Sequence, residues 1–164
     1  MTAQIAEKLY YDGDEHSMTT NPLGDYFYYA GIKPDFADTC TALWRGYVGT
    51  WEIIENRLYL IDLRGTLNDG SEATLATFFP EFPERVFAHW YTGTIRLPQG
   101  KLLKYVHMGY GSTYERDIML SVENGVIVDT AVRHNGTADD NAPKGYGVGA
   151  FTLFSSSRNR KAEP

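Results

Sequence analysis

The feature that most constrains the fold is a series of short, aromatic-rich segments between residues 43 and 133, separated by turn sequences. Aromatic and β-branched residues favour strands, and clusters of Asn, Asp, Gly and Pro favour the hairpin turns that join them. No internal repeat or domain linker interrupts the series. The sequence therefore predicts a mainly β protein: a single antiparallel sheet of hairpins, strongly curved or partly closed, with one short covering helix.

The N-terminal region is expected to begin with a small hairpin. Residues 8–18 read as two short strands that turn at Asp12-Gly13, because Asp and Gly tolerate the positive φ of a tight turn. Residues 26–29, which read Tyr-Phe-Tyr-Tyr, form either a short helix or an extended run, and their periodicity does not distinguish the two. Residues 34–41 are expected to be connecting chain.

The first strong hairpin joins residues 43–54 to residues 58–67. A three-residue loop between these strands places Trp51 opposite Ile61 and Ile53 opposite Tyr59. The residues expected on the core side are Tyr47, Trp51, Ile53, Tyr59, Ile61 and Leu63. Gly46 and Gly49 within a strand indicate a bulge, a sharp bend or the close approach of another backbone.

A helix and the next hairpin are expected to follow. Ser71 follows a turn and caps a helix that begins at Glu72 and ends before Pro80. Residues 86–97 and 101–108 then form a hairpin around Pro98-Gln99-Gly100.

The last hairpin joins residues 115–122 to residues 126–133, and two registers are possible. A two-residue Asn124-Gly125 turn places Arg116 opposite Arg133, which is unfavourable. A three-residue loop that includes Glu123 pairs Glu115 with Arg133 and apolar residues with each other. The second register is therefore favoured.

The C-terminal region is expected to contain one more strand. Residues 134–147 are polar and glycine-rich, residues 148–154 favour a final strand, and residues 155–164 are typical of a disordered tail. The prediction is one domain over residues 1–154 with a polar tail over residues 155–164.

Charge and cysteine content limit the classes of partner. The net charge is −6, which disfavours nucleic acid and anionic membranes and suits a basic protein partner. Cys40 is the one cysteine, so no internal disulfide can form, and the sequence shows neither a signal peptide nor an apolar run long enough to span a bilayer. These features predict a cytoplasmic protein.

The densest set of polar groups lies between residues 107 and 117. Glycines on either side of Tyr110 let the backbone approach a ligand, while histidine, tyrosine and acidic side chains can bind or transfer protons. The same residues also suit a tight turn at a sheet corner, with Glu115 and Arg133 as a structural ion pair. The candidate ligand- or partner-binding residues are His107, Tyr110, Tyr114, Glu115, Arg116, His89 and Trp90.

His89 and His107 form a second candidate site. In the expected hairpin they lie diagonally across neighbouring strands, about 7–8 Å apart on one face. Imidazole is a common metal ligand, but no cysteine or carboxylate of that hairpin completes a set. Neither a metal nor another cofactor is therefore expected. The glycines of residues 145–149 lack the strand–loop–helix context and the Lys-Ser/Thr pair of a phosphate-binding loop.

Four segments resemble sequences shared by a set of small uncharacterised bacterial proteins. They are residues 10–13 with 21–23, residues 44–53 (WRGYVGTWEI), residues 87–100 (FAHWYTGTIRLPQG) and residues 105–117 (YVHMGYGSTYERD). The resemblance implies a bacterial cytoplasmic protein. It implies no activity, so no catalytic residue follows from it.

Three hypotheses for the function remain. The leading one is a non-enzymatic interaction protein, such as an immunity-type inhibitor of a toxin or of another basic protein, because small size, acidity and the absence of a catalytic motif favour binding. The second is a small-molecule-binding β-barrel with an aromatic-lined pocket. The third is a hydrolase that uses His107 with Glu115 or Asp117.

Overall fold

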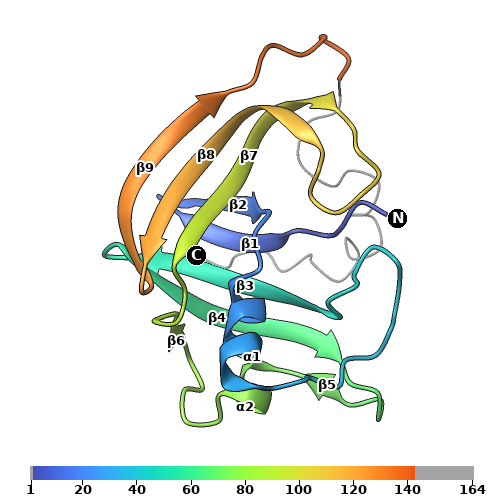
Figure 1. The fold of residues 1–164 in the computed structure, drawn as a ribbon, viewed down its shortest axis with the longest axis vertical. Coiled ribbons are helices and arrows are strands. Elements are labelled where there is room, and N and C mark those ends of the chain that lie inside the picture. The colour runs from blue at the N-terminus through green and yellow to red at the C-terminus, as the bar shows by residue number, and fades with distance from the viewer. Residues whose placement is uncertain (1, 143–164) are drawn as a thin grey trace.

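The structure is a computed structural model that describes residues 2–142, and it confirms a mainly β protein. Nine strands in the described chain form one mixed sheet that is not closed, in the order β2-β1-β3-β4-β9-β8-β7, with β5 and β6 also paired to β4 (Figure 1). The elements are β1 (Glu7–Tyr11), β2 (Asp14–Met18), α1 (Pro22–Ala30), β3 (Tyr47–Ile54), β4 (Arg57–Thr66), β5 (Glu72–Ala73), α2 (Leu75–Phe78), β6 (Val86–Phe87), β7 (Gly93–Lys104), β8 (Thr113–Glu123) and β9 (Val126–His134).

The prediction of a purely antiparallel sheet is wrong, because β1 and β3 run parallel. A parallel pair needs a long connection, and here residues 12–46, with β2 and α1, supply it. The sheet also has a weak junction, since β4 and β9 share only the pair Arg57–Val126 among the described residues. The residues of the expected final strand, 148–154, lie outside the described range, as do those of the tail and of the glycine-rich segment 145–149.

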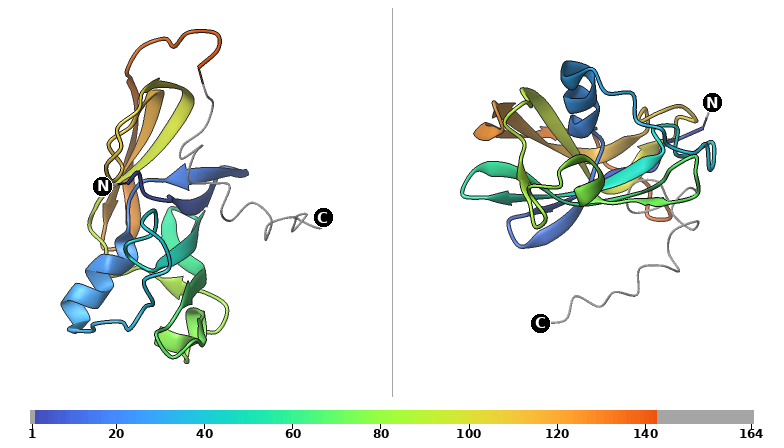
Figure 2. Two further views of the ribbon diagram at one scale, coloured as in Figure 1. Left: turned by 90° about the vertical axis from the view of Figure 1, so that its right-hand side faces the viewer. Right: turned by 90° about the horizontal axis from the view of Figure 1, so that it is seen from below.

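The small N-terminal hairpin is confirmed, with positive φ at both Asp12 and Gly13. The aromatic run after it is helical and forms part of α1, which Pro22 begins and a left-handed Gly31 ends. α1 packs onto β3 through the edge-to-face contact of Phe27 with Tyr47. Figure 2 shows α1 standing to one side of β3 and β4.

The register predicted for the β3–β4 hairpin is wrong by one residue at the turn. Ile54 pairs with Arg57 around a two-residue turn, and Trp51 faces Leu60 rather than Ile61. Glu55 and Asn56 both have positive φ, which a two-residue turn of this type requires. Ile61 is left over as a bulge, so the buried residues of β4 are Leu58, Leu60 and Leu63, while Tyr59 and Ile61 are only partly buried.

The predicted hairpin around residues 98–100 is absent, and these residues lie within the continuous strand β7. β7 pairs with β8 along nearly its whole length, with irregularities between Gln99 and Leu102 and between Leu102 and Lys104. Gly100 has a φ of +83° at the first irregularity, so the glycine serves a bulge instead of a turn.

The β8–β9 hairpin adopts neither predicted register. The turn is the two-residue Asn124-Gly125, but Val128 forms a bulge that shifts the rest of the strand by one residue. Arg133 therefore lies opposite Asp117, and the predicted pairing of Arg133 with Glu115 is wrong. A two-residue turn is disfavoured in the sequence because it places Arg116 opposite Arg133, and the bulge removes that like-charge pair.

The predicted helix after residue 71 is shorter and begins later. Glu72 and Ala73 form β5, and α2 follows Thr74, which caps it in a reciprocal capping box with Thr77. Leu75 and Phe79 are buried.

The core lies between the sheet and the two helices. Its members are mainly leucines and aromatic residues, among them the fully buried Trp51, Leu9, Leu58, Leu60, Leu63, Ile95, Leu97 and Leu120. Many aromatic side chains pack on one another here, as Phe79 stacks on Trp90 with ring centroids 5.9 Å apart. In the described chain no helix is long and apolar enough to cross a membrane.

Candidate functional site

The polar segment singled out in the sequence lies at one end of the molecule. Residues 105–112 form the loop from β7 to β8, close to the N-terminus and to the loop that precedes β3 (Figure 1). Tyr114, Glu115 and Arg116 follow on β8. The predicted site residues of this segment are thus divided between a loop and a strand.

Arg96 on β7 holds this loop in place. Its two terminal nitrogens donate to the carbonyl oxygens of Tyr110 and Ser112, each at 2.8 Å, and its Nε donates to Asp117 Oδ1 at 2.9 Å. The Ser112 hydroxyl is buried and accepts a bond from the backbone N–H of Val106 at 3.0 Å. A single guanidinium therefore fixes the end of the loop to the sheet.

Asp117 is fully buried at the centre of this arrangement. Its second oxygen accepts bonds from the Arg133 guanidinium at 2.6 Å and from Asn135 Nδ2 at 2.9 Å. Burial alone would raise the pKa of Asp117, but the hydrogen bonds from Asn135, Arg133 and Arg96 outweigh it and lower that pKa. The carboxylate is ionised and committed to structural partners.

Glu115 also has a structural task. Its Oε1 accepts the backbone N–H of Lys101 at 2.8 Å and its Oε2 accepts that of Ala138 at 3.1 Å. These two bonds lower the pKa of Glu115. The side chain thus replaces ladder bonds that the bulge at Gly100 removes, and it ties residues 135–142 to the sheet.

The other predicted site residues have different environments. Tyr114 is buried, and its carbonyl accepts a bond from Asn135, while Arg116 is exposed on β8. Trp90 packs on Tyr26 and Phe79 and donates its Nε1–H to the Pro22 carbonyl at 2.8 Å. Trp90 therefore links the turn before β7 to α1.

His89 and His107 do not face each other across a hairpin, so that prediction is wrong. His89 precedes β7 and His107 follows it, because β7 is one strand and not two. His107 Nδ1 lies 2.8 Å from the Tyr105 hydroxyl, and no hydrogen bond in the described chain joins it to Glu115 or Asp117. No group of three or more His, Cys, Asp or Glu side chains in residues 2–142 is arranged to hold a metal ion.

The sequence did not predict a second buried acidic residue, Glu7. Glu7 on β1 is fully buried, and its Oε2 accepts bonds from the backbone N–H of Gly49 and from Arg45 at 2.9 Å, while Trp51 Nε1 lies 3.4 Å from Oε1. Burial raises the pKa of Glu7, although the Arg45 charge and these bonds oppose it. Two signals were available, because Glu7 shares a strand face with Leu9 and because Gly49 marks a close approach.

Tyr110 reaches this second cluster from the β7–β8 loop. Its hydroxyl donates to Asn21 Oδ1 at 2.7 Å and lies 3.3 Å from the Ile5 carbonyl, which also accepts a bond from Arg45. Burial raises the pKa of Tyr110 to about 12, so its phenol is neutral. Tyr110 therefore anchors the loop at a second point and is not an exposed binding group.

Large side chains remain exposed around this anchored loop. We call Trp44, Tyr105, His107 and Met108 the aromatic rim; Trp44 is 52% exposed, Tyr105 56% and Met108 51%. Gln4 joins the two loops that carry them, since its Oε1 accepts the N–H of Trp44 at 2.8 Å and its N–H donates to the Gly109 carbonyl at 2.9 Å. The rim is thus a set of exposed side chains on a backbone held by buried bonds.

Comparisons with family models, with curated proteins and with solved structures found no match to this chain.

Proposed function

We propose that this chain is a non-enzymatic interaction protein that binds a basic protein partner through the aromatic rim, in the manner of an immunity-type inhibitor of a toxin. The observation that carries the proposal is the rim itself: exposed Trp44, Tyr105 and Met108 on loops fixed by Arg96, Gln4 and Tyr110. Tryptophan, tyrosine and methionine are enriched at protein interfaces.

The rigidity of the rim favours binding. A loop that is already ordered loses little conformational entropy when a partner binds, so more of the contact energy remains as affinity. Arg96 and Tyr110 order the β7–β8 loop, and the Gln4 bonds order the backbone at Trp44.

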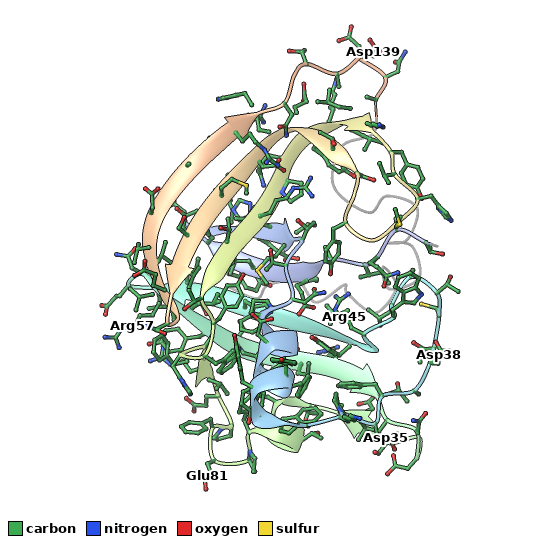
Figure 3. All side chains as sticks on the ribbon, in the orientation of Figure 1. Asp35, Asp38, Arg45, Arg57, Glu81 and Asp139 are labelled. Carbon is green, nitrogen blue, oxygen red and sulfur yellow. The ribbon has the colours of Figure 1, made fainter. Side chains whose placement is uncertain are left out.

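The charge of the chain favours a basic partner. The net charge of −6 attracts a positively charged protein over several ångströms and speeds its association. The loop that carries Trp44 also presents Asp38 at the surface, as Figure 3 shows. We place this function in the cytoplasm of a bacterium, in keeping with the single Cys40 and with the resemblance to small bacterial proteins.

The contacts give less support to the other two hypotheses. The buried aromatic residues pack on one another and on leucines, which is the environment of a core. His107 contacts Tyr105, while Glu115 and Asp117 are bound to backbone and to arginines, so a hydrolytic pair is not assembled.

The test begins with capture of the partner from the native host, its identification by native mass spectrometry, and measurement of its dissociation constant. Truncation of a central interface aromatic costs about 2 kcal/mol or more, so Trp44→Ala and Tyr105→Ala should each weaken binding about 30-fold. The matched control is Tyr29→Ala, because Tyr29 is 72% exposed and lies on α1 and not on either loop of the rim.

The proposal also predicts the salt dependence and a control of folding. Affinity for the partner should fall as salt rises, and Asp38→Asn should reduce that dependence. Each variant should keep its thermal midpoint within a few degrees of wild type. Equal affinity of the Trp44, Tyr105 and Tyr29 variants for the partner would refute the assignment of the rim.

A further inference from the structure

Within residues 2–142, the strand β9 has one edge that is largely unpaired, which we call the free edge. One of its edges pairs with β8, but on the other only Val126 pairs with β4, and Ile127 donates one bond to the Asn56 carbonyl. From residue 128 to residue 134 that second edge has no strand partner in the described chain, and every residue is exposed. Figure 1 shows β9 along the outer margin of the molecule.

Few of the devices that usually prevent edge pairing act over residues 128–134, where the two charged side chains, Asp129 and Arg133, have opposite signs. The edge has no proline and no lysine, and the bulge at Val128 lies at its beginning. Val128 and Val132 are each 52% exposed. A row of unpaired backbone N–H and C=O groups of this length is a template for another strand.

The β8–β9 register determines which residues of β9 direct their backbone N–H and C=O groups to the free edge; we call this alternation the hydrogen-bond phase of the edge. The N–H of Asn135 donates to the Glu115 carbonyl at 2.8 Å, and the register continues without a shift to Asp129. Bonded and non-bonded pairs alternate in an antiparallel ladder, so Arg133, Ala131 and Asp129 direct their backbone groups to β8. Thr130 and Val132 therefore direct theirs to the free edge.

This phase restricts how two copies of β9 can pair antiparallel. A centre at Ala131 lets Thr130 of each copy exchange both backbone bonds with Val132 of the other. The same register places Asp129 of each copy directly opposite Arg133 of the other, in the non-bonded position where side chains are closest. Registers centred on Thr130 or on Val132 also satisfy the phase, but they pair neither charge with its opposite.

We propose that the edge of β9 binds a second copy of this chain, in a two-fold symmetric antiparallel pairing centred on Ala131. Charge complementarity identifies the occupant, because Asp129 and Arg133 make the edge complementary to itself. Asp129 forms no ion pair within the described residues, while Arg133 is 56% exposed beyond its contact with Asp117. The inference is independent of the aromatic rim.

The test combines a crosslink with measurement of mass in solution, both on the full chain. In a Cys40→Ser background, Ala131→Cys should form an intermolecular disulfide under mild oxidation, since its Cα atoms would lie about 4.5 Å apart. Thr130→Cys and Val132→Cys are matched controls, because each would crosslink efficiently only in the register centred on itself. Sedimentation should show a dimer whose population rises with protein concentration, because an interface made by one strand from each copy is small and the dimer forms by mass action.

A proline variant tests the backbone pairing without breaking the fold. The N–H of Thr130 faces away from β8, so Thr130→Pro removes an edge donor and leaves the β8–β9 ladder intact. Two symmetry-related bonds are lost, and the dimer should weaken about thirtyfold while the melting temperature of the monomer changes little.

Three results would overturn the proposal. One is a monomer at every concentration up to millimolar. Another is a crosslink that favours Thr130→Cys or Val132→Cys over Ala131→Cys. The third is strong, concentration-independent protection of the Thr130 and Val132 amides from hydrogen exchange, which would mean that residues 143–164 of the same chain occupy the edge.

Discussion

The buried carboxylate of Asp117 gives the sharpest prediction about stability. Asp117→Asn keeps the size of the side chain and removes the charge that faces Arg96 and Arg133. Loss of one partner of a buried pair costs about 3–5 kcal/mol when the other stays unpaired in the interior. Here the cost should be smaller, because the Arg133 side chain is 56% exposed and water can solvate its charge once Asp117 is neutral. The Arg96 side chain is only 19% exposed, so most of the cost should come from its charge.

We therefore expect Asp117→Asn to lower the free energy of unfolding by about 2–4 kcal/mol, measured by urea denaturation. For a chain of this length, the corresponding fall in melting temperature is roughly 5–12 °C. The matched control is Asp62→Asn, because Asp62 pairs with Arg64 at 3.1 Å on the surface, where such a pair contributes about 0–1 kcal/mol.

The same variant should loosen the β7–β8 loop. Arg96 donates to the Tyr110 and Ser112 carbonyls, and without Asp117 its guanidinium loses the acceptor that orients it. Amide exchange of residues 105–112 should then accelerate more than that of α1. A cost below about 1 kcal/mol, equal to that of Asp62→Asn, would refute the claim that Asp117 organises this end of the sheet.

Two further predictions concern close packing and pH. A Cβ at Gly49 would meet Glu7 Oε1 at 2.7 Å and Trp51 Nε1 at 2.8 Å, so Gly49→Ala should lower the free energy of unfolding by about 1–3 kcal/mol. Gly24→Ala in α1, where the nearest atom is Tyr47 Oη at 4.0 Å, should raise it by about 0.5–1 kcal/mol, and equal effects in thermal melts would contradict the packing argument. Because the folded-state pKa of Asp117 is lowered, its contribution to stability is present above its unfolded pKa of about 4 and is lost as the pH falls through the folded value. Acid denaturation should therefore be steeper below about pH 4 for wild type than for Asp117→Asn, and superimposable curves would contradict this assignment.

Local signals in the sequence predicted the local parts of the fold. Asp12-Gly13 forms the expected turn, and the hairpins that turn at Glu55-Asn56 and at Asn124-Gly125 lie where the sequence places them. The registers failed because bulges at Ile61 and Val128 each insert one residue, and a bulge has no reliable signature in a single sequence. Pro98-Gln99-Gly100 has the composition of a turn, and the pairing of β7 with β8 overrides it.

The non-local parts of the fold could not be predicted, because pairing between segments far apart in the chain leaves no local signature in the sequence. Alternation within β1 does not show that it pairs parallel to β3, some forty residues away. The polar composition of residues 107–117 marks this segment in the sequence but does not show which of its side chains are buried anchors. Asp117 and Tyr110 are anchors because Arg96 and Asn21 reach them from other elements, while Trp44, on a separate loop, joins the exposed surface through Gln4.

The measurement that tests the central proposal most directly is an amide hydrogen-exchange footprint of the full chain with and without its captured partner. The account predicts that added protection concentrates in residues 42–46 and 105–112, the two loops of the aromatic rim. α1, which carries the more exposed Tyr28 and Tyr29, should exchange at the same rate in both samples. Protection confined to α1, with the two rim loops unchanged, would contradict the assignment of the rim as the binding surface.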